Sequence, residues 1–147
     1  MGALSWYYFL PYNPNVVQAL HFLRKREFDA GRYFPAMPIL DFPINPRSPS
    51  PGPSHASIEQ AMRAAGETGT RSIIDMTAIN SHRGRGILVE LSTNKLFELY
   101  GSRFPTHEMV EQNMDFFTQI DRGEGVFFTV YEGDTPLELF FAGYSYD

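Results

Sequence analysis

The densest group of chemically versatile side chains is the run Ser81-His82-Arg83-Gly84-Arg85-Gly86. It places two guanidinium groups and one imidazole among glycines, which is typical of a turn. Such a turn can direct backbone N–H groups and arginine side chains at one anion. A simpler interpretation is a surface turn whose arginines only keep the protein soluble. Under the first interpretation, His82, Arg83 and Arg85 are candidate anion-binding residues.

A second candidate site involves the proline-rich stretch 32–54. Apolar and aromatic side chains lie among its prolines, so residues 32–45 are expected to form an ordered, extended arm on the core. Residues 46–54 have little to bury and are expected to form a mobile loop. A pocket beneath the arm would be lined by tyrosines and a guanidinium. Its candidate binding residues are Tyr8, Tyr12, Arg32 and Tyr33.

No sequence pattern predicts a catalytic residue, a metal site or a cofactor. The chain has no cysteine, and its four histidines lack the short spacing of a local metal site. The tail Gly143-Tyr144-Ser145-Tyr146-Asp147 begins like a nucleophile elbow but lacks the closing glycine. An enzyme is therefore the less favoured expectation.

Acidic residues are concentrated in the last third of the chain. Residues 108–147 contain nine acidic residues and one basic residue, Arg122. Such a surface can dock a basic protein partner, although an ordinary solvated helix face has the same composition. The candidate partner surface combines acidic residues with aromatic residues that need a cover, from a helix of this chain, a second copy of the chain or a partner: Glu108, Glu111, Asp115, Phe127, Tyr131 and Phe140.

Length, composition and charge limit the class of protein. The 147 residues, 43% of them hydrophobic, predict one globular domain spanning 1–147. A formal net charge of −5 argues against nucleic-acid binding. No run approaches the ~20 apolar residues that span a bilayer. The apolar stretch Trp6–Leu10 has no basic residue before it, so it does not predict a secretory signal, and the expected location is the cytoplasm.

Apolar spacing and capping residues predict the elements that would position these side chains. Helices are expected over 14–30, 57–65, 93–100 and 106–122, and strands over 5–10, 72–76, 86–91, 126–132 and 136–142. The predicted fold is α+β, with an antiparallel sheet of about four to five strands. Three to four helices are expected to pack mainly on one of its faces.

The last two strands are predicted to form a hairpin around Gly133 and Asp134. A four-residue loop, 133–136, would pair Phe128 with Phe141 and place both on the core face. The opposite face would then carry Phe127, Tyr131 and Phe140, whose rings would need a cover.

Three segments carry a resemblance: Trp6-Tyr7-Tyr8-Phe9, Gly69-Thr70-Arg71-Ser72-Ile73-Ile74-Asp75, and the tail from Phe140 to Asp147. They resemble short, uncharacterised bacterial proteins of similar length. The resemblance implies a bacterial, cytoplasmic setting and brings no activity. The leading expectation is a non-catalytic interaction protein, accessory or immunity-type, that binds a protein partner. The alternative is a small-molecule or anion-binding protein, or an enzyme, with a pocket near residues 32–45 and 81–86.

Overall fold

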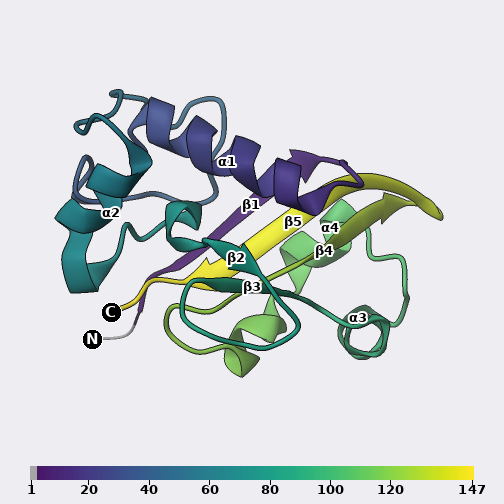
Figure 1. The fold of residues 1–147 in the computed structure, drawn as a ribbon. Coiled ribbons are helices and arrows are strands. Elements are labelled where there is room, and N and C mark those ends of the chain that lie inside the picture. The colour runs from purple at the N-terminus through teal and green to yellow at the C-terminus, as the bar shows by residue number, and fades with distance from the viewer. Residues whose placement is uncertain (1–2) are drawn as a thin grey trace.

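A five-stranded mixed sheet in the order β1-β5-β4-β3-β2 forms the centre of the molecule (Figure 1). The computed structural model describes residues 3–147. The strands are β1 (Ser5–Pro11), β2 (Ala78–Ile79), β3 (Ile87–Glu90), β4 (Gly125–Glu132) and β5 (Thr135–Tyr144). The α-helices are α1 (Val16–Ala30), α2 (Ile58–Ala65), α3 (Thr93–Tyr100) and α4 (His107–Gln112). The 3-10 turns are η1 (Gly66–Thr68), η2 (Ile73–Asp75) and η3 (Asp115–Gln119).

The α+β class is confirmed, but the prediction of an antiparallel sheet is wrong. The strands β1, β5 and β4 are antiparallel neighbours, whereas β3 runs parallel to β4 and to β2. Parallel neighbours are usually joined by a crossover connection of a dozen residues or more, although only residues 80–86 join β2 to β3. The chain between β3 and β4 supplies one, because it contains α3, α4 and η3.

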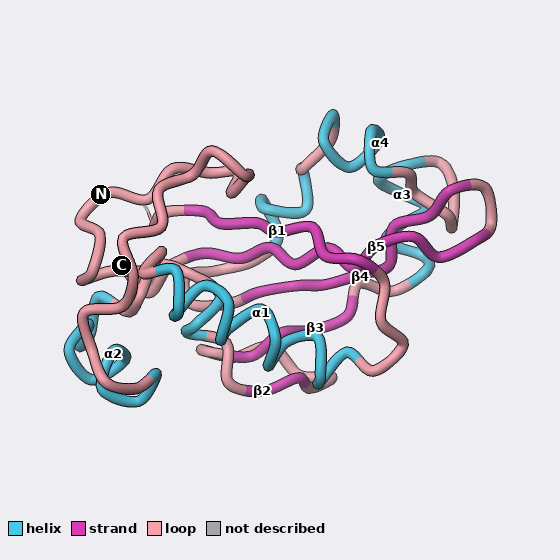
Figure 2. The backbone as a smooth tube through the Cα atoms, turned by 90° about the horizontal axis from the view of Figure 1, so that it is seen from above, coloured by secondary structure: helices cyan, strands magenta, loops and turns pink. Residues whose placement is uncertain are grey.

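Helices cover both faces of the sheet, not mainly one (Figures 1 and 2). On one face, α1 and η2 pack over a cluster that includes Trp6, Phe127 and Phe141. On the other face, residues of α3, α4 and η3 pack over Phe128 and Phe140. Both faces of β4 and β5 are apolar, so each of them requires a cover.

The hairpin register differs from the prediction. Glu132 pairs with Thr135, leaving a two-residue loop, and a bulge follows between Val130 and Tyr131. Phe128 therefore pairs with Phe140 instead of Phe141. A slip of one residue exchanges the faces of every side chain on a strand, which explains the wrong assignment of the core face.

Capping residues define most helix boundaries as the sequence predicts. Ser57, Ser92 and Thr106 each accept a hydrogen bond from the backbone N–H three residues ahead. Gly31 and Gly101 end α1 and α3 in the left-handed conformation.

Two other predicted elements are wrong, and in both of them a polar side chain hydrogen-bonds to backbone groups. Ser72 accepts from the Ile74 N–H, and residues 73–75 form η2 instead of a strand. Asn113 donates to the Leu99 carbonyl and accepts from the Asp115 N–H, so the helix predicted over 106–122 divides into α4 and η3.

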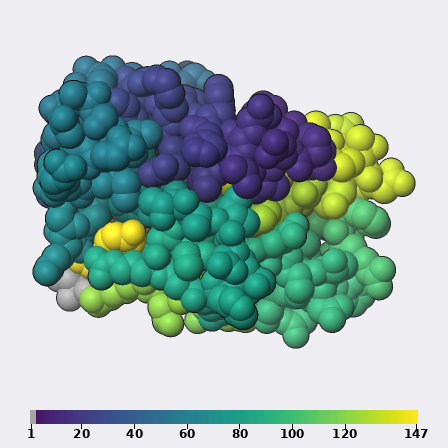
Figure 3. Space-filling model, viewed as in Figure 1, coloured from purple at the N-terminus to yellow at the C-terminus, as the bar shows by residue number. Residues whose placement is uncertain are grey.

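Residues 32–57 form turns and bends without helix or strand. Tyr33 is fully buried, and Phe42 and Ile44 pack against the core. Figure 3 shows this segment and α1 together on one side of the molecule, and the yellow C-terminal atoms emerging between teal neighbours. Within the described residues 3–147, no helix has the length and apolar character needed to cross a membrane.

Candidate functional site

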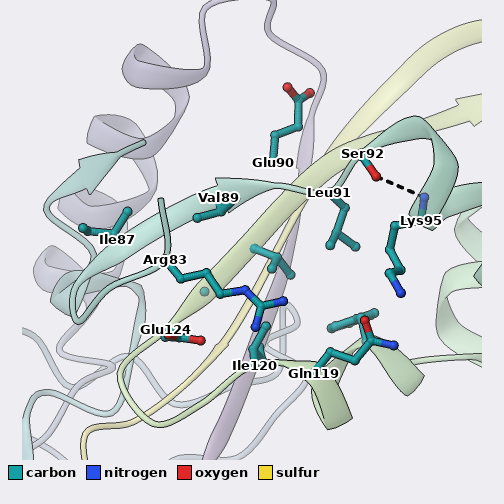
Figure 4. Close-up of a pocket in the computed structure, with 13 residues that line it drawn as sticks. Arg83, Ile87, Val89, Glu90, Leu91, Ser92, Lys95, Gln119, Ile120 and Glu124 are labelled. Carbon is teal, nitrogen blue, oxygen red and sulfur yellow. Dashed lines mark hydrogen bonds between the residues drawn. The ribbon is translucent and has the colours of Figure 1, made fainter. Parts of the chain in front are cut away.

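The residues of the 81–86 turn point to different places. His82 is exposed. The Arg85 guanidinium lies 4.0 Å above the centre of the Tyr146 ring and donates a hydrogen bond to the Glu67 carbonyl. Arg83 instead turns into a cavity on the α3 and η3 side of the sheet (Figure 4). The three candidates therefore do not converge on one anion.

The cavity that receives Arg83, here the Arg83 pocket, has a volume of about 210 Å³. It lies between β3, the segment that contains η3, and the start of α3. Its floor is apolar. Alternate side chains of β3 point to the same face of the sheet, and there they meet the apolar side chains of η3 and its neighbours. The floor residues are Ile87, Val89, Leu91, Phe116, Ile120 and Val126.

Two of the charged groups around the Arg83 pocket already have partners. Lys95 forms an ion pair with Glu98 at 2.7 Å, and Glu124 accepts a hydrogen bond from the Asp121 N–H. Glu90 points away from the cavity, as Figure 4 shows. Arg83 points into the cavity, and no residue in the described range 3–147 forms a hydrogen bond or ion pair with its guanidinium. The pocket therefore combines an apolar floor with one uncommitted cation.

The candidates near the proline-rich segment divide between separate places. Tyr8 and Arg32 line a second cavity, at the β1 edge of the sheet. Tyr33 is buried, with its hydroxyl 2.7 Å from His55 Nδ1, and Tyr12 lies in a shallow surface depression. Because β1 and β3 lie on opposite sides of the β5–β4 pair, the two expected parts of one pocket are two distinct cavities.

Sequence reasoning missed Arg26, which lines the second cavity, and Glu27, which binds both Arg26 and Arg32. Glu27 follows Leu20 and Leu23 at helical spacing, so it occupies a core-facing position of α1. That spacing was the available signal, because a carboxylate on an apolar stripe requires buried partners.

The candidate partner surface is partly inside the protein. Phe127 and Phe140 are buried within the chain, in the two clusters on opposite faces of the sheet. Of the three covers expected for these rings, the chain itself provides one, so Phe127 and Phe140 are not part of an exposed partner surface. Tyr131 is half-buried against Phe104, with ring centres 5.0 Å apart.

The acidic candidates Glu108, Glu111 and Asp115 remain exposed. Glu111 also contacts His107, whose Nε2 lies 3.3 Å from a Glu111 oxygen. His107 Nδ1 lies 2.6 Å from Glu138, and its ring stacks on Phe9. The imidazole thus links α4 to β5 and β1, whereas the sequence indicated only a histidine in the first turn of a helix.

One carboxyl group is deeply buried. Asp75 Oδ1 accepts hydrogen bonds of 2.8 Å from the backbone N–H and the hydroxyl of Thr70. Its Oδ2 has no hydrogen-bond partner among the described atoms. Burial raises the pKa of the Asp75 carboxyl, and the hydrogen bonds from Thr70 oppose this effect.

In the part of the chain that the structure describes, no three histidine, aspartate or glutamate side chains are grouped as metal ligands. No protein-family model, curated protein or solved structure matches the chain.

Proposed function

We propose that the protein binds a small anion with an apolar body, such as a short-chain or aromatic carboxylate, in the Arg83 pocket. The observation that carries the proposal is the unpaired Arg83 guanidinium above an apolar floor. An arginine fork matches the two oxygens of a carboxylate and binds them at close range.

The floor would supply the remaining affinity. Contact with Val89, Phe116 and Ile120 removes ligand carbon atoms from water, which stabilises binding by about 25 cal/mol per Å² of apolar surface. A cavity of about 210 Å³ limits the ligand to a compact molecule. The proposal is for binding without catalysis, in a bacterial cytoplasmic protein.

Calorimetric titration with hexanoate tests the proposal, with hexanol and acetate as comparison ligands. Hexanoate is expected to bind more tightly than either, because hexanol lacks the charge and acetate lacks the apolar chain. Arg83→Gln should weaken hexanoate binding about tenfold and leave hexanol unaffected. The matched control is Arg63→Gln, which removes an exposed arginine of α2 that lines none of these cavities.

Equal affinities of wild type and Arg83→Gln for hexanoate would contradict the proposal. Equal affinities of the wild type for hexanoate and acetate would contradict the role of the floor.

A second candidate function is the docking of a basic protein partner on α4. The specific observation is that two large apolar side chains, Phe104 and Met109, are 43% and 38% exposed close to Glu108. Exposed apolar side chains beside acidic residues suit a partner with apolar and basic residues.

A further inference from the structure

The second cavity, here the β1-edge pocket, has a volume of about 300 Å³. It lies where β1, the end of α1 and residues 44–46 meet. Tyr8 and Phe9 come from β1, Arg26 comes from α1, and Arg32 follows the helix. It shares no lining residue with the Arg83 pocket, so a ligand bound at the β1 edge is independent of the function proposed for the Arg83 pocket.

A buried carboxylate organises the two arginines of this pocket. Glu27 is 0% exposed. Arg32 binds it in bidentate fashion, with Nε at 2.9 Å from Oε1 and Nη2 at 2.8 Å from Oε2. Arg26 Nε adds a third hydrogen bond, of 2.9 Å, to Oε2. Two guanidinium groups therefore share one carboxylate, and the cluster keeps one net positive charge.

This positive charge is accessible from the cavity. The side chains of Arg26 and Arg32 are 35% and 12% exposed. Arg32 Nη1 donates to the Ser50 hydroxyl, so all three of its nitrogens have partners. By contrast, no residue between 3 and 147 accepts a hydrogen bond from either Nη group of Arg26. Arg26 thus has free donors, while its Nε is fixed by Glu27.

The outer edge of β1 provides a further free donor. The Tyr12 N–H donates to Leu137 and the Ser145 N–H donates to Leu4, so even-numbered residues of β1 face β5. The backbone groups of Phe9 therefore point away from the sheet. None of the backbone hydrogen bonds of the described turns and loops reaches Phe9.

We propose that the β1-edge pocket binds a small oxyanion, a carboxylate or a phosphate, through the free Nη groups of Arg26 and the outward N–H of Phe9. Nitrogen donors on a positively charged cluster suit an anion with several acceptor oxygens. Glu27 orients Arg26 beforehand, so little side-chain entropy is lost on binding.

The competing explanation is that Arg26 and Arg32 serve only to neutralise buried Glu27 and to hold residues 44–50. Both explanations predict that the arginines contribute to the stability of the protein. They differ in anion binding, which only the proposed site predicts.

The experiment is a titration of the full chain with inorganic phosphate and, separately, with succinate, monitored by the chemical shifts of backbone amides and of arginine guanidinium groups. Sodium chloride at matched ionic strength is the reference. Saturable shifts at Phe9 and the Arg26 side chain are expected with at least one oxyanion and not with chloride. The two arms distinguish a phosphate site from a carboxylate site, and saturable binding of neither oxyanion overturns the proposal.

Two substitutions test the residues. Arg26→Gln should weaken oxyanion binding about tenfold, while Glu27 keeps its bidentate pair with Arg32 and the fold is retained. Arg63→Gln is the matched control and should bind as the wild type does. Unchanged affinity in Arg26→Gln overturns the proposal.

Glu27→Gln is expected to change the oxyanion affinity in the opposite direction to Arg26→Gln. It removes the only carboxylate of the cluster, so oxyanion affinity should rise although the protein without ligand is less stable. A purely structural role predicts lower stability with no gain in affinity. Arg26→Lys keeps the charge but loses the fork, and it replaces Arg26→Gln if that variant does not fold.

Discussion

Burial of the Asp75 carboxyl makes the stability of the folded protein depend on pH. The pKa of this carboxyl is raised by burial, so the folded protein holds the proton more tightly than the unfolded chain does. The stabilising contribution of this proton is complete below the ordinary pKa of an aspartate. It is lost as the pH rises through the folded-state pKa.

Asp75→Asn keeps an oxygen for the donors of Thr70 but does not titrate. The wild type loses the stabilising contribution of the Asp75 proton between pH 3 and pH 7, whereas the variant does not. The free energy of unfolding of Asp75→Asn minus that of wild type is therefore expected to rise over this range, by about 1.4 kcal/mol for each unit by which the pKa is raised. Urea denaturation of both proteins across this range measures the difference. Asp134→Asn, at the exposed hairpin tip, should show a constant difference. A constant difference for Asp75→Asn as well would contradict the prediction.

At the residue scale, the sequence identified side-chain types better than their surroundings. Arg83 was a candidate, and it does line a pocket. Its expected companions His82 and Arg85 lie elsewhere, because Tyr146 attracts Arg85 and occupies the space beside Gly86 and Gly123. Such long-range contacts leave no local pattern in the sequence. The position of Glu27 on the apolar side of its helix was readable, but the meeting of Arg26 with the edge of β1 was not.

Among the elements, the junction between α1 and the proline-rich segment depends on one glycine. Gly31 has φ +74°, and a Cβ built there would lie 2.0 Å from the Gly52 carbonyl oxygen. This close approach lets the Gly52 N–H donate to the Ala30 carbonyl. The end of the helix and residues 50–52 are thereby joined.

Placing an alanine in the left-handed conformation costs ~1–2 kcal/mol. Gly31→Ala is expected to destabilise the protein by more than this, because residues 50–52 must also move away from the end of α1. The control is Gly101→Ala, with φ +68° and no neighbour within 4 Å, which should lose only the conformational contribution. Urea denaturation measures both. Trypsin cleavage after Arg47 should accelerate in Gly31→Ala alone, and equal losses in the two variants would contradict this.

Trypsin cleavage of the wild type also measures the mobility expected for residues 46–54, which stays a prediction.

At the scale of elements, helix caps were predictable because the residues that make them are close in sequence, as at Ser57 and Ser92. The hairpin register was not, because both faces of β4 and β5 are apolar and the alternation of side chains therefore does not identify the bulge at Val130 and Tyr131.

For the molecule as a whole, the acidic surface of α4 tests the second candidate function. Glu108→Lys is expected to slow association with a lysine-rich peptide severalfold at low salt, since exposed charges act mainly on the association rate. High salt should remove the difference. Asp41→Lys makes the same change of charge in the proline-rich segment and should have a smaller effect. Equal effects of the two variants would show that net charge, and not α4, governs binding.

The pairing of β1 with β5 determines how the molecule responds to mechanical force. β1 touches the sheet only through β5, and the two strands meet with Ser5 opposite Tyr144 and Pro11 opposite Glu138. A pull that separates Ser5 from Tyr144 therefore loads the hydrogen bonds one after another, as in opening a zipper, and never shears them together. The force needed to open the sheet from this end is therefore the force that breaks one β1–β5 hydrogen bond at a time. As β1 peels away, the Phe9 wall of the β1-edge pocket leaves with it, so tension on the chain ends would dismantle that cavity before it reaches the β4–β5 hairpin.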